Sequence, residues 1–450
     1  MRTATETLTN ETVELLQAMI VNRCVNDGTP ASGQEVRNAD TLEAYLEGNG
    51  LAFERYEPTP GRVSLVSRIP GSNPDAPSLC LMGHTDVVPV NESGWSRDPF
   101  GGERVATVDG VEEIWGRGAV DMLNLTASMA VAFKEIARSG RRPEGDLIYF
   151  AVADEESGSA HGMRWMADHA ADAIRADHVL TENGGLHSGS PESPSISVTV
   201  AEKGVAWRRL RVKGVPGHGS MPFRRDNALV TAAAVIQRLT DYRPPAKMTE
   251  LWRERVSSME LDAETAATLL DPDKLDAALD AMPSVAKAAL MHACTHTTFS
   301  CNVVDGGLMK TNVIPDDVVL EVDIRTLPGE SATEVQAHLD TALGDLAGRV
   351  EVEAIMNDPA SISQVNTPLW DQLAKAAKKP FPTARLTPSM SVGFTDARIY
   401  REMGAVAYGA GLLSPFVTAG EFGSRFHGND ERIDVESLEL CTQFWLDVIA

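Results

Sequence analysis

An imidazole and a carboxylate directly follow a short apolar segment in the first fifth of the chain. The run at residues 77–82 (PSLCLM) has the length of a buried strand, and His84 and Asp86 come just after it. Because alternate residues of an extended segment point the same way, both side chains are expected on one face. A metal-bound imidazole usually donates its other N–H to a carboxylate, which fixes its tautomer and its orientation. The pair indicates a metal ligand with its orienting acid, but a polar strand end with one satisfied histidine gives the same pattern.

The pattern of a strand followed by acids recurs twice downstream. The apolar run at 147–153 (LIYFAVA) leads into Glu155 and Glu156, and the weaker run at 178–181 (HVLT) leads into Glu182. In a parallel sheet, ligands bind beyond the carboxyl ends of the strands. We therefore expect these acids to lie beside His84. Taken alone, a pair of glutamates at a strand end is more often simply solvated.

Two further candidates complete a set of imidazole and carboxylate ligands. Asp121 precedes an apolar helix predicted at about 122–138, and His427 lies near the end of the chain. The candidate metal ligands are His84, Asp121, Glu156, Glu182 and His427. A mixed set without thiolate suits zinc, manganese or cobalt at a catalytic site. The set exceeds the needs of one tetrahedral ion, whereas two ions sharing a carboxylate would use it fully and leave room for a bridging water.

The elements that must position these residues alternate between strand and helix. This alternation predicts an α/β fold with a mostly parallel sheet flanked by helices. From about residue 204 the strands become half-exposed, as in an inserted α+β domain, and the first pattern resumes near 358. We therefore predict a catalytic domain in two parts, 1–203 and 358–450, and an inserted lid at 204–357. Residues 246–300 lengthen this lid, and capping-box patterns predict helix starts at Ser32–Glu35 and Ser331–Glu334.

Composition narrows the class of protein further. The 450 residues carry a formal net charge of −24, which argues against nucleic acid and anionic membranes as partners. The five cysteines are odd in number and scattered, as expected in a reducing compartment. The first residues lack a signal-peptide pattern, and no apolar run approaches the length of a membrane span. We expect a soluble cytoplasmic protein.

The chain resembles the family of two-zinc exopeptidases and amidohydrolases that includes glutamate carboxypeptidase, succinyl-diaminopimelate desuccinylase, acetylornithine deacetylase and aminoacylase. The matching residues are spread over essentially the whole chain: Gly83-His-Thr-Asp86, Gly116-Arg-Gly-Ala-Val-Asp121, Asp154-Glu-Glu156, Glu182, Gly217-His-Gly-Ser220, Asn312, Asp323-Ile-Arg325 and His427. As a set they are highly specific. The resemblance implies a zinc-exopeptidase-like catalytic domain with an inserted lid and dimerisation domain.

The resemblance also implies a role for each site residue. His84 and Glu182 would hold one divalent ion, Glu156 and His427 a second, and Asp121 would bridge them. Zn²⁺ is expected, with Co²⁺ or Mn²⁺ as substitutes. Asp86 would orient His84, and Glu155 would act as general base.

The inserted domain is implied to contribute residues of its own. It would pair two subunits into a homodimer, so that His218 reaches the partner's active site and supports the oxyanion. Asn312 and Arg325 would hold the substrate carboxylate. The other histidines have no partner motif and are expected to be structural or on the surface: His161, His169, His178, His187, His292, His296 and His338.

Together these features predict a hydrolase of amide bonds next to a free carboxylate. The substrate would be a dipeptide or an N-acyl amino acid, attacked by a hydroxide that bridges the metals after Glu155 removes its proton. Two alternatives remain at this stage. One is a dedicated N-acyl amino acid deacylase of the desuccinylase or deacetylase type, and the other is a non-catalytic metal-binding relative.

Overall fold

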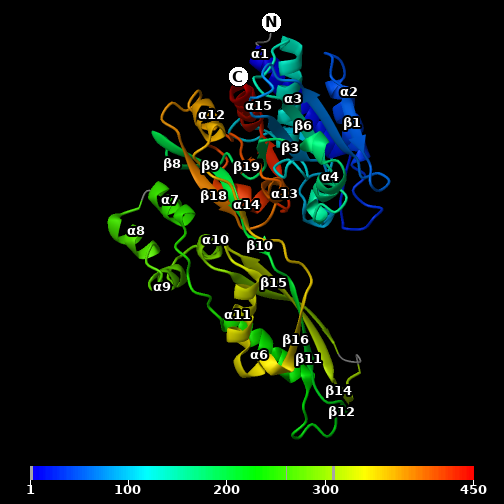
Figure 1. The fold of residues 1–450 in the computed structure, drawn as a ribbon, viewed down its shortest axis with the longest axis vertical. Helices are drawn as coiled ribbons and strands as arrows, with labels where there is room; N and C mark the ends of the chain where they lie inside the picture. Colours follow the sequence, from blue (N-terminus) through cyan, green and yellow to red (C-terminus); the bar gives the residue numbers. More distant parts are fainter. Residues whose placement is uncertain (1–3, 260, 307–309) are drawn as a thin grey trace. The chain divides into compact units, whose positions relative to one another are not determined.

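The chain folds into two compact units in a computed structural model that describes residues 4–259, 261–306 and 310–450 (Figure 1). Unit 1 comprises Met1–Val200, Ser363–Ser389 and Thr395–Ala450. Unit 2 comprises Ala201–Ile362 and Met390–Phe394. The first unit is thus built from three separate segments of the chain.

A mixed sheet with a parallel centre forms the framework of unit 1. Within the described residues it has ten strands, with β1-β2-β6-β3-β7-β19-β9-β17 as its main path. The strands are β1 (Phe53–Tyr56), β2 (Ser64–Ile69), β3 (Leu79–His84), β6 (Leu147–Val152), β7 (His178–Thr181), β8 (His187–Ser190), β9 (Ser193–Glu202), β17 (Ser361–Ile362), β18 (Arg385–Ser391) and β19 (Val406–Gly409). Strands β6, β3, β7 and β19 run parallel, whereas β2 and β9 join them antiparallel. This architecture confirms the predicted mostly parallel sheet.

Helices cover both faces of this sheet. Alternate side chains of a strand point to opposite faces, and every residue of β6 is buried, so neither face is open to solvent there. On one face Phe150 packs in a cluster with residues of α4 (Met163–His169), α5 (Ala171–Ile174) and α13 (Ala397–Glu402). On the other face Tyr149 contacts Phe133 of α3 (Leu123–Ser139). The other helices of unit 1 are α1 (Ala4–Val21), α2 (Val36–Leu46), α12 (Pro368–Ala377), α14 (Ala419–Arg425) and α15 (Val435–Ile449). A small sheet of β4 (Glu103–Ala106), β5 (Glu112–Trp115) and β20 (Arg432–Asp434) adds to them.

The carboxyl ends of the central strands meet at one edge. The last residue of β3, His84, pairs in register with Val152, the last residue of β6. On its other side β3 runs parallel to β7. The segments that follow these three strands therefore begin side by side.

Unit 2 is built on a separate antiparallel sheet. Its order is β10-β15-β11-β16, with β13 also paired to β15. The strands are β10 (Gly204–Val205), β11 (Arg208–Lys213), β13 (Thr298–Gly306), β15 (Asp317–Thr326) and β16 (Val350–Ala354). Burial alternates strictly along β15, whose inner side chains pack against α6 (Ala228–Asp241) and α11 (Ala332–Leu343). The insert therefore has its own core.

Two smaller features of unit 2 bear on function. Strands β12 (Gly217–His218) and β14 (Val313–Ile314) form a two-stranded ribbon. Four short helices occupy most of the stretch between α6 and β13. They are α7 (Glu250–Ser258), α8 (Ala263–Leu269), α9 (Leu275–Asp280) and α10 (Val285–Thr295).

Only one of the two capping-box predictions agrees with the structure. Ser331 and Glu334 form a complete capping box at the start of α11. The prediction at Ser32 and Glu35 is wrong, because α2 begins at Val36 and has no side-chain cap. Glu35 is instead buried in an ion pair with Arg62, with 2.6 Å between Oε1 and Nη1.

The helices of the described residues include none that combines the length and the apolar character needed to cross a membrane.

Candidate metal centre

Five segments of unit 1 bring their polar side chains to the edge where β3, β6 and β7 end. His84 ends β3, Glu155 and Glu156 follow β6, and Glu182 follows β7. Asp121 comes from the loop before α3, and His427 from the loop after α14. His84, Asp121, Glu155 and Glu182 are buried, whereas the side chain of His427 is 47% exposed. The predicted ligands of unit 1 therefore lie together.

Asp121 lies between the two histidines. Its Oδ1 is 3.2 Å from Nε2 of His84, and its Oδ2 is 2.9 Å from Nε2 of His427. Nε2 of His427 is also 3.3 Å from Oε2 of Glu156. Each oxygen of one carboxylate thus faces a different imidazole, which is the arrangement that a carboxylate shared by two ions requires.

The donor atoms fall into two overlapping groups. His84, Asp121 and Glu156 offer one ligand atom each within 4.8 Å of one another, and so do His84, Glu155 and Glu182. The Oε1 atom of Glu156 is buried and has no hydrogen-bond partner among the described residues. An acceptor-only atom without a donor is costly to bury, so this oxygen fits a cation.

His84 is oriented by the segment that follows it. Its Nδ1 is 2.9 Å from the backbone carbonyl of Asp86 and 3.5 Å from the Asp86 carboxylate. A carbonyl oxygen can only accept, so Nδ1 carries the proton and Nε2 presents its lone pair to the centre. The predicted orienting residue therefore acts mainly through its backbone.

The electrostatics of the centre reflect several acids packed in a buried space. Burial, reinforced by neighbouring carboxylates, raises the pKa of Glu155 and of Glu182 well above the usual range. Hydrogen bonds to Asp121 and Glu156 raise the pKa of His427 to about 10. Burial opposes protonation of His84, but hydrogen bonds to Asp121 and Asp86 still raise its pKa well above normal. The cluster thus attracts positive charge, either as protons or as metal ions.

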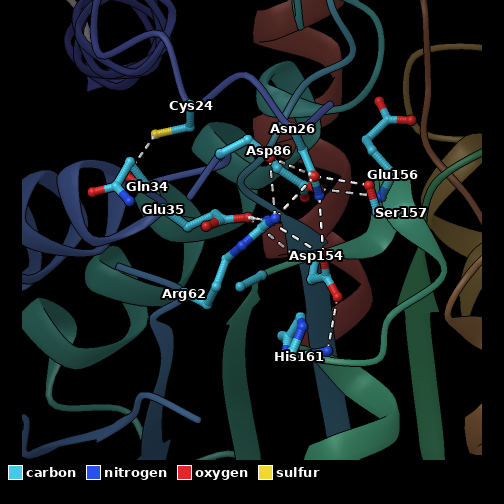
Figure 2. A network of polar contacts seen from close by, with 12 residues as sticks. Cys24, Asn26, Gln34, Glu35, Arg62, Asp86, Asp154, Glu156, Ser157 and His161 are labelled. Carbon is cyan, nitrogen blue, oxygen red and sulfur yellow. Dashed lines mark hydrogen bonds and ion pairs between the residues drawn. The ribbon is translucent and has the colours of Figure 1, made fainter. Parts of the chain in front are cut away.

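A buried polar network joins the segments that carry the candidate ligands (Figure 2). This network was not predicted from the sequence. Asn26 donates through Nδ2 to Asp86 at 2.8 Å and to Asp154 at 3.1 Å. Its Oδ1 accepts from Arg62 at 3.0 Å and from Ser157 at 2.7 Å. One amide therefore joins the segment after β3 to the segment after β6. An isolated asparagine carries no spacing signal that would reveal this role.

A second support, also missed, fixes the loop that carries Asp121. Oε1 of the buried Glu431 accepts from the backbone N–H groups of Val120 at 2.8 Å and Asp121 at 3.1 Å. Its Oε2 accepts from Arg117 at 2.6 Å, and Arg117 also donates to the carbonyl of His427 at 3.3 Å. Burial raises the pKa of Glu431 to about 7, against the opposing charge of Arg117. The pair ties the Asp121 loop to the His427 loop.

The three site residues predicted in the insert lie in unit 2 and are not all close to one another. His218 pairs with Val313 in the β12–β14 ribbon, and the N–H of Gly219 donates to the carbonyl of Asn312 at 2.8 Å. Arg325 lies near the far end of β15, eight residues or roughly 26 Å beyond the first residue of that strand. Within a single copy of unit 2, Asn312 therefore lies close to His218 and far from Arg325.

Arg325 is held in a half-buried polar and aromatic setting. Its Nε donates to Asp323 at 2.7 Å, and its guanidinium lies 5.5 Å from the ring centre of Phe394 and 5.9 Å from that of Trp207. Its Nη1 is buried without a hydrogen-bond partner among the described residues. This atom is a donor available to an anion.

Comparison with known proteins adds the family. The model of peptidase family M20/M25/M40 matches residues 80–450, which include every ligand candidate. The chain belongs to this family. It is therefore a hydrolase of the M20 metallopeptidase and amidohydrolase class, as the sequence motifs predicted.

The similar proteins span peptidases and deacylases. A probable carboxypeptidase S-like protein of Dictyostelium discoideum is 26% identical over 92% of this chain and 84% of its own length. A succinyl-diaminopimelate desuccinylase of Phenylobacterium zucineum is 26% identical over 91% of this chain and 92% of its own length. The fold matches the crystal structure of an M20 family metallo-carboxypeptidase from Sulfolobus solfataricus, with a TM-score of 0.72 and 19% identity over 98% of both chains.

Proposed function

We propose that this M20 hydrolase uses two divalent ions, most simply Zn²⁺, to cleave an amide bond next to a free carboxylate. The observation that carries the proposal is the position of Asp121, with one oxygen toward His84 and the other toward His427. In this proposal His84 and Glu182 hold one ion, Glu156 and His427 hold the other, and Asp121 is shared. Bound ions of this kind supply Lewis acidity and lower the pKa of water.

Glu155 moves the proton in this proposal. Its carboxylate lies in the group formed with His84 and Glu182, and no role as a ligand is needed for it. Its raised pKa, caused by burial, suits a group that accepts a proton from the attacking water and returns it to the departing nitrogen. Its neighbour Glu156 keeps the role of ligand, so the two adjacent acids divide the work.

Unit 2 supplies recognition of the substrate. Nη1 of Arg325 has a free donor position, and a guanidinium binds a carboxylate through two parallel hydrogen bonds. His218 is exposed on the β12–β14 ribbon and is a suitable donor to a developing oxyanion. Because His218 and Asn312 lie far from Arg325 within one unit 2, we propose that this pair acts in the active site of a partner subunit. A homodimer would then carry composite sites.

A dedicated deacylase is the second candidate. The match to a succinyl-diaminopimelate desuccinylase over nearly the full length of both chains favours it. Peptidase and deacylase share the attacked bond and the free carboxylate, and they differ in the group on the other side of the amide. The centre in unit 1 serves either reaction.

A substrate screen tests the proposal. Zinc-loaded protein is incubated with N-acyl amino acids and dipeptides, each paired with an analogue whose carboxylate is an amide, and the products are measured by mass spectrometry. Hydrolysis of the free acids with little hydrolysis of the amides is expected. Equal hydrolysis of both would contradict carboxylate recognition, and bound zinc without any hydrolysis would leave a non-catalytic metal-binding protein.

A further inference from the structure

A second group of metal-ligand side chains lies in the helical part of unit 2. His292 lies in the last turn of α10, His296 directly follows the end of this helix, and Asp276 reaches them from α9. The imidazole rings are stacked, with centroids 4.1 Å apart and planes 7° from parallel. Each residue offers one ligand atom, and the three atoms lie within 4.8 Å of one another. All three residues belong to unit 2, so this group is separate from the centre in unit 1.

His296 presents a buried lone pair to Asp276. Its Nδ1 is 3.1 Å from the carbonyl oxygen of His292, which can only accept, and 2.9 Å from Oγ1 of Thr295. Because the Thr295 hydroxyl donates to the carbonyl of Met291 at 2.9 Å, we place the proton of the imidazole on Nδ1. Nε2 is then an acceptor, and it lies 3.2 Å from Oδ1 of Asp276. Neither atom has a hydrogen-bond partner among the described residues, and His296 is fully buried. Two acceptors in contact repel each other unless a proton or a metal ion lies between them.

The surroundings keep both imidazoles neutral. Burial lowers the pKa of His292 to about 4 and also lowers the pKa of His296, and the charges of Arg243 and Lys203 act in the same direction. Ring nitrogens that do not carry a proton can serve as metal ligands.

The group also has access to solvent. Asp276 has a 43% exposed side chain, and together with His292 and Asp280 it lines an open cavity of about 360 Å³. Arg243 lines the same cavity and reduces its negative potential. An ion can reach the group, and water or a ligand carboxylate could fill its open coordination positions.

We propose that His292, His296 and Asp276 form an additional divalent cation site that joins α9 to α10. Imidazole ligands together with a carboxylate suit Zn²⁺ or Co²⁺. Bonds of about 2.0–2.1 Å in a tetrahedral site place the donor atoms roughly 3.3 Å apart. The stacked rings must therefore turn slightly toward the ion. We assign this site a structural role, because Glu155, the residue proposed to move the proton, lies in unit 1.

Metal counting tests this site without reference to activity. Wild type and His292→Ala are saturated with Zn²⁺, freed of excess metal by gel filtration and analysed by mass spectrometry. The variant should retain about one zinc ion per chain less than wild type, however many ions unit 1 binds. The matched control His169→Ala removes an exposed histidine that stacks on Trp165, and it should retain the wild-type amount.

A second variant guards against misfolding. Asp276→Asn changes a half-exposed side chain and should also lose about one ion, with an unchanged circular dichroism spectrum. Binding of Co²⁺ provides an independent readout, since tetrahedral Co²⁺ absorbs strongly in the visible range and His292→Ala should lose part of this absorption. Equal zinc content and equal Co²⁺ spectra in wild type, His292→Ala and Asp276→Asn would overturn the proposal.

Discussion

The two ligand clusters of this molecule differ in how the chain builds them. The cluster in unit 1 gathers six side chains from five segments at the ends of parallel strands, and buried networks around Asn26 and Glu431 support it. The cluster in unit 2 lies within residues 276–296, on α9 and at the end of α10, and Nδ1 of His296 contacts the carbonyl of His292 and the hydroxyl of Thr295. The difference fits the catalytic role proposed for the cluster in unit 1 and the structural role proposed for the cluster in unit 2.

The two clusters also differ in charge. Unit 1 packs four carboxylates around two imidazoles, and burial raises the pKa of three of them, Glu155, Glu156 and Glu182. Unit 2 has one carboxylate against two neutral imidazoles. Disrupting cation binding should therefore have a larger effect in unit 1 than in unit 2. The following variants test this order, beginning with the one expected to change the protein most.

Removing the shared carboxylate should have the largest effect. Asp121→Ala deletes the oxygens that face His84 and His427. Binding of both ions in unit 1 should weaken by more than the roughly 10–100-fold loss that follows removal of an outer partner. Hydrolysis should fall to background, whereas the exposed control Asp98→Ala should behave as wild type. Retention of tight metal binding in Asp121→Ala would show that the carboxylate is not shared.

Removing the proposed base should affect turnover alone. Glu155→Gln keeps the size of the side chain but cannot accept the proton of the attacking water. Turnover should drop by about 10²–10⁴-fold, the usual contribution of a general base, while metal content stays at the wild-type value. Loss of metal together with activity would instead make Glu155 a ligand.

Removing Asn26, which joins the segments of the supporting network, should have an intermediate effect on zinc affinity. Asn26→Ala deletes the hydrogen bonds to Asp86 and Asp154 without touching a ligand. Zinc affinity of unit 1, measured by competition with a chromophoric chelator, should fall by about 10–100-fold. Asn73→Ala, at an exposed turn, is the control. An unchanged affinity in Asn26→Ala would mean that the strand ends alone position the ligands.

The smallest effect is expected from the cluster in unit 2. Free zinc at about five times the dissociation constant of that site should stabilise the folded state by about 1 kcal/mol in wild type but not in Asp276→Asn. Hydrogen exchange of the α9 and α10 amides reports this change locally, and turnover should be unchanged. Loss of turnover in Asp276→Asn would show that this cluster is more than a local cross-link.

Sequence reasoning recovered the parallel centre of the sheet and the side chains that gather at its edge. The reason is that His84, Glu156 and Glu182 follow recognisable strands and Asp121 precedes a recognisable helix, whereas no such element marks His427. Asn26, Arg62 and Glu431 were missed because their hydrogen bonds join segments that are distant in the sequence, and such contacts leave no periodicity in it.

Two further pairs of residues show where local sequence patterns fail. Ser32 and Glu35 match a capping box, but the buried ion pair with Arg62 takes Glu35 away from that role. His292 and His296 have ligand spacing, yet their third partner, Asp276, belongs to a different helix and is visible only in the fold. Tertiary contacts decided both cases.

The most direct test of the shared-carboxylate centre is anomalous X-ray diffraction at the zinc absorption edge from crystals of the zinc-loaded protein. The account predicts two peaks about 3.5–4 Å apart on either side of Asp121, one beside His84 and Glu182 and the other beside Glu156 and His427. A single peak at this position, or none, would contradict it.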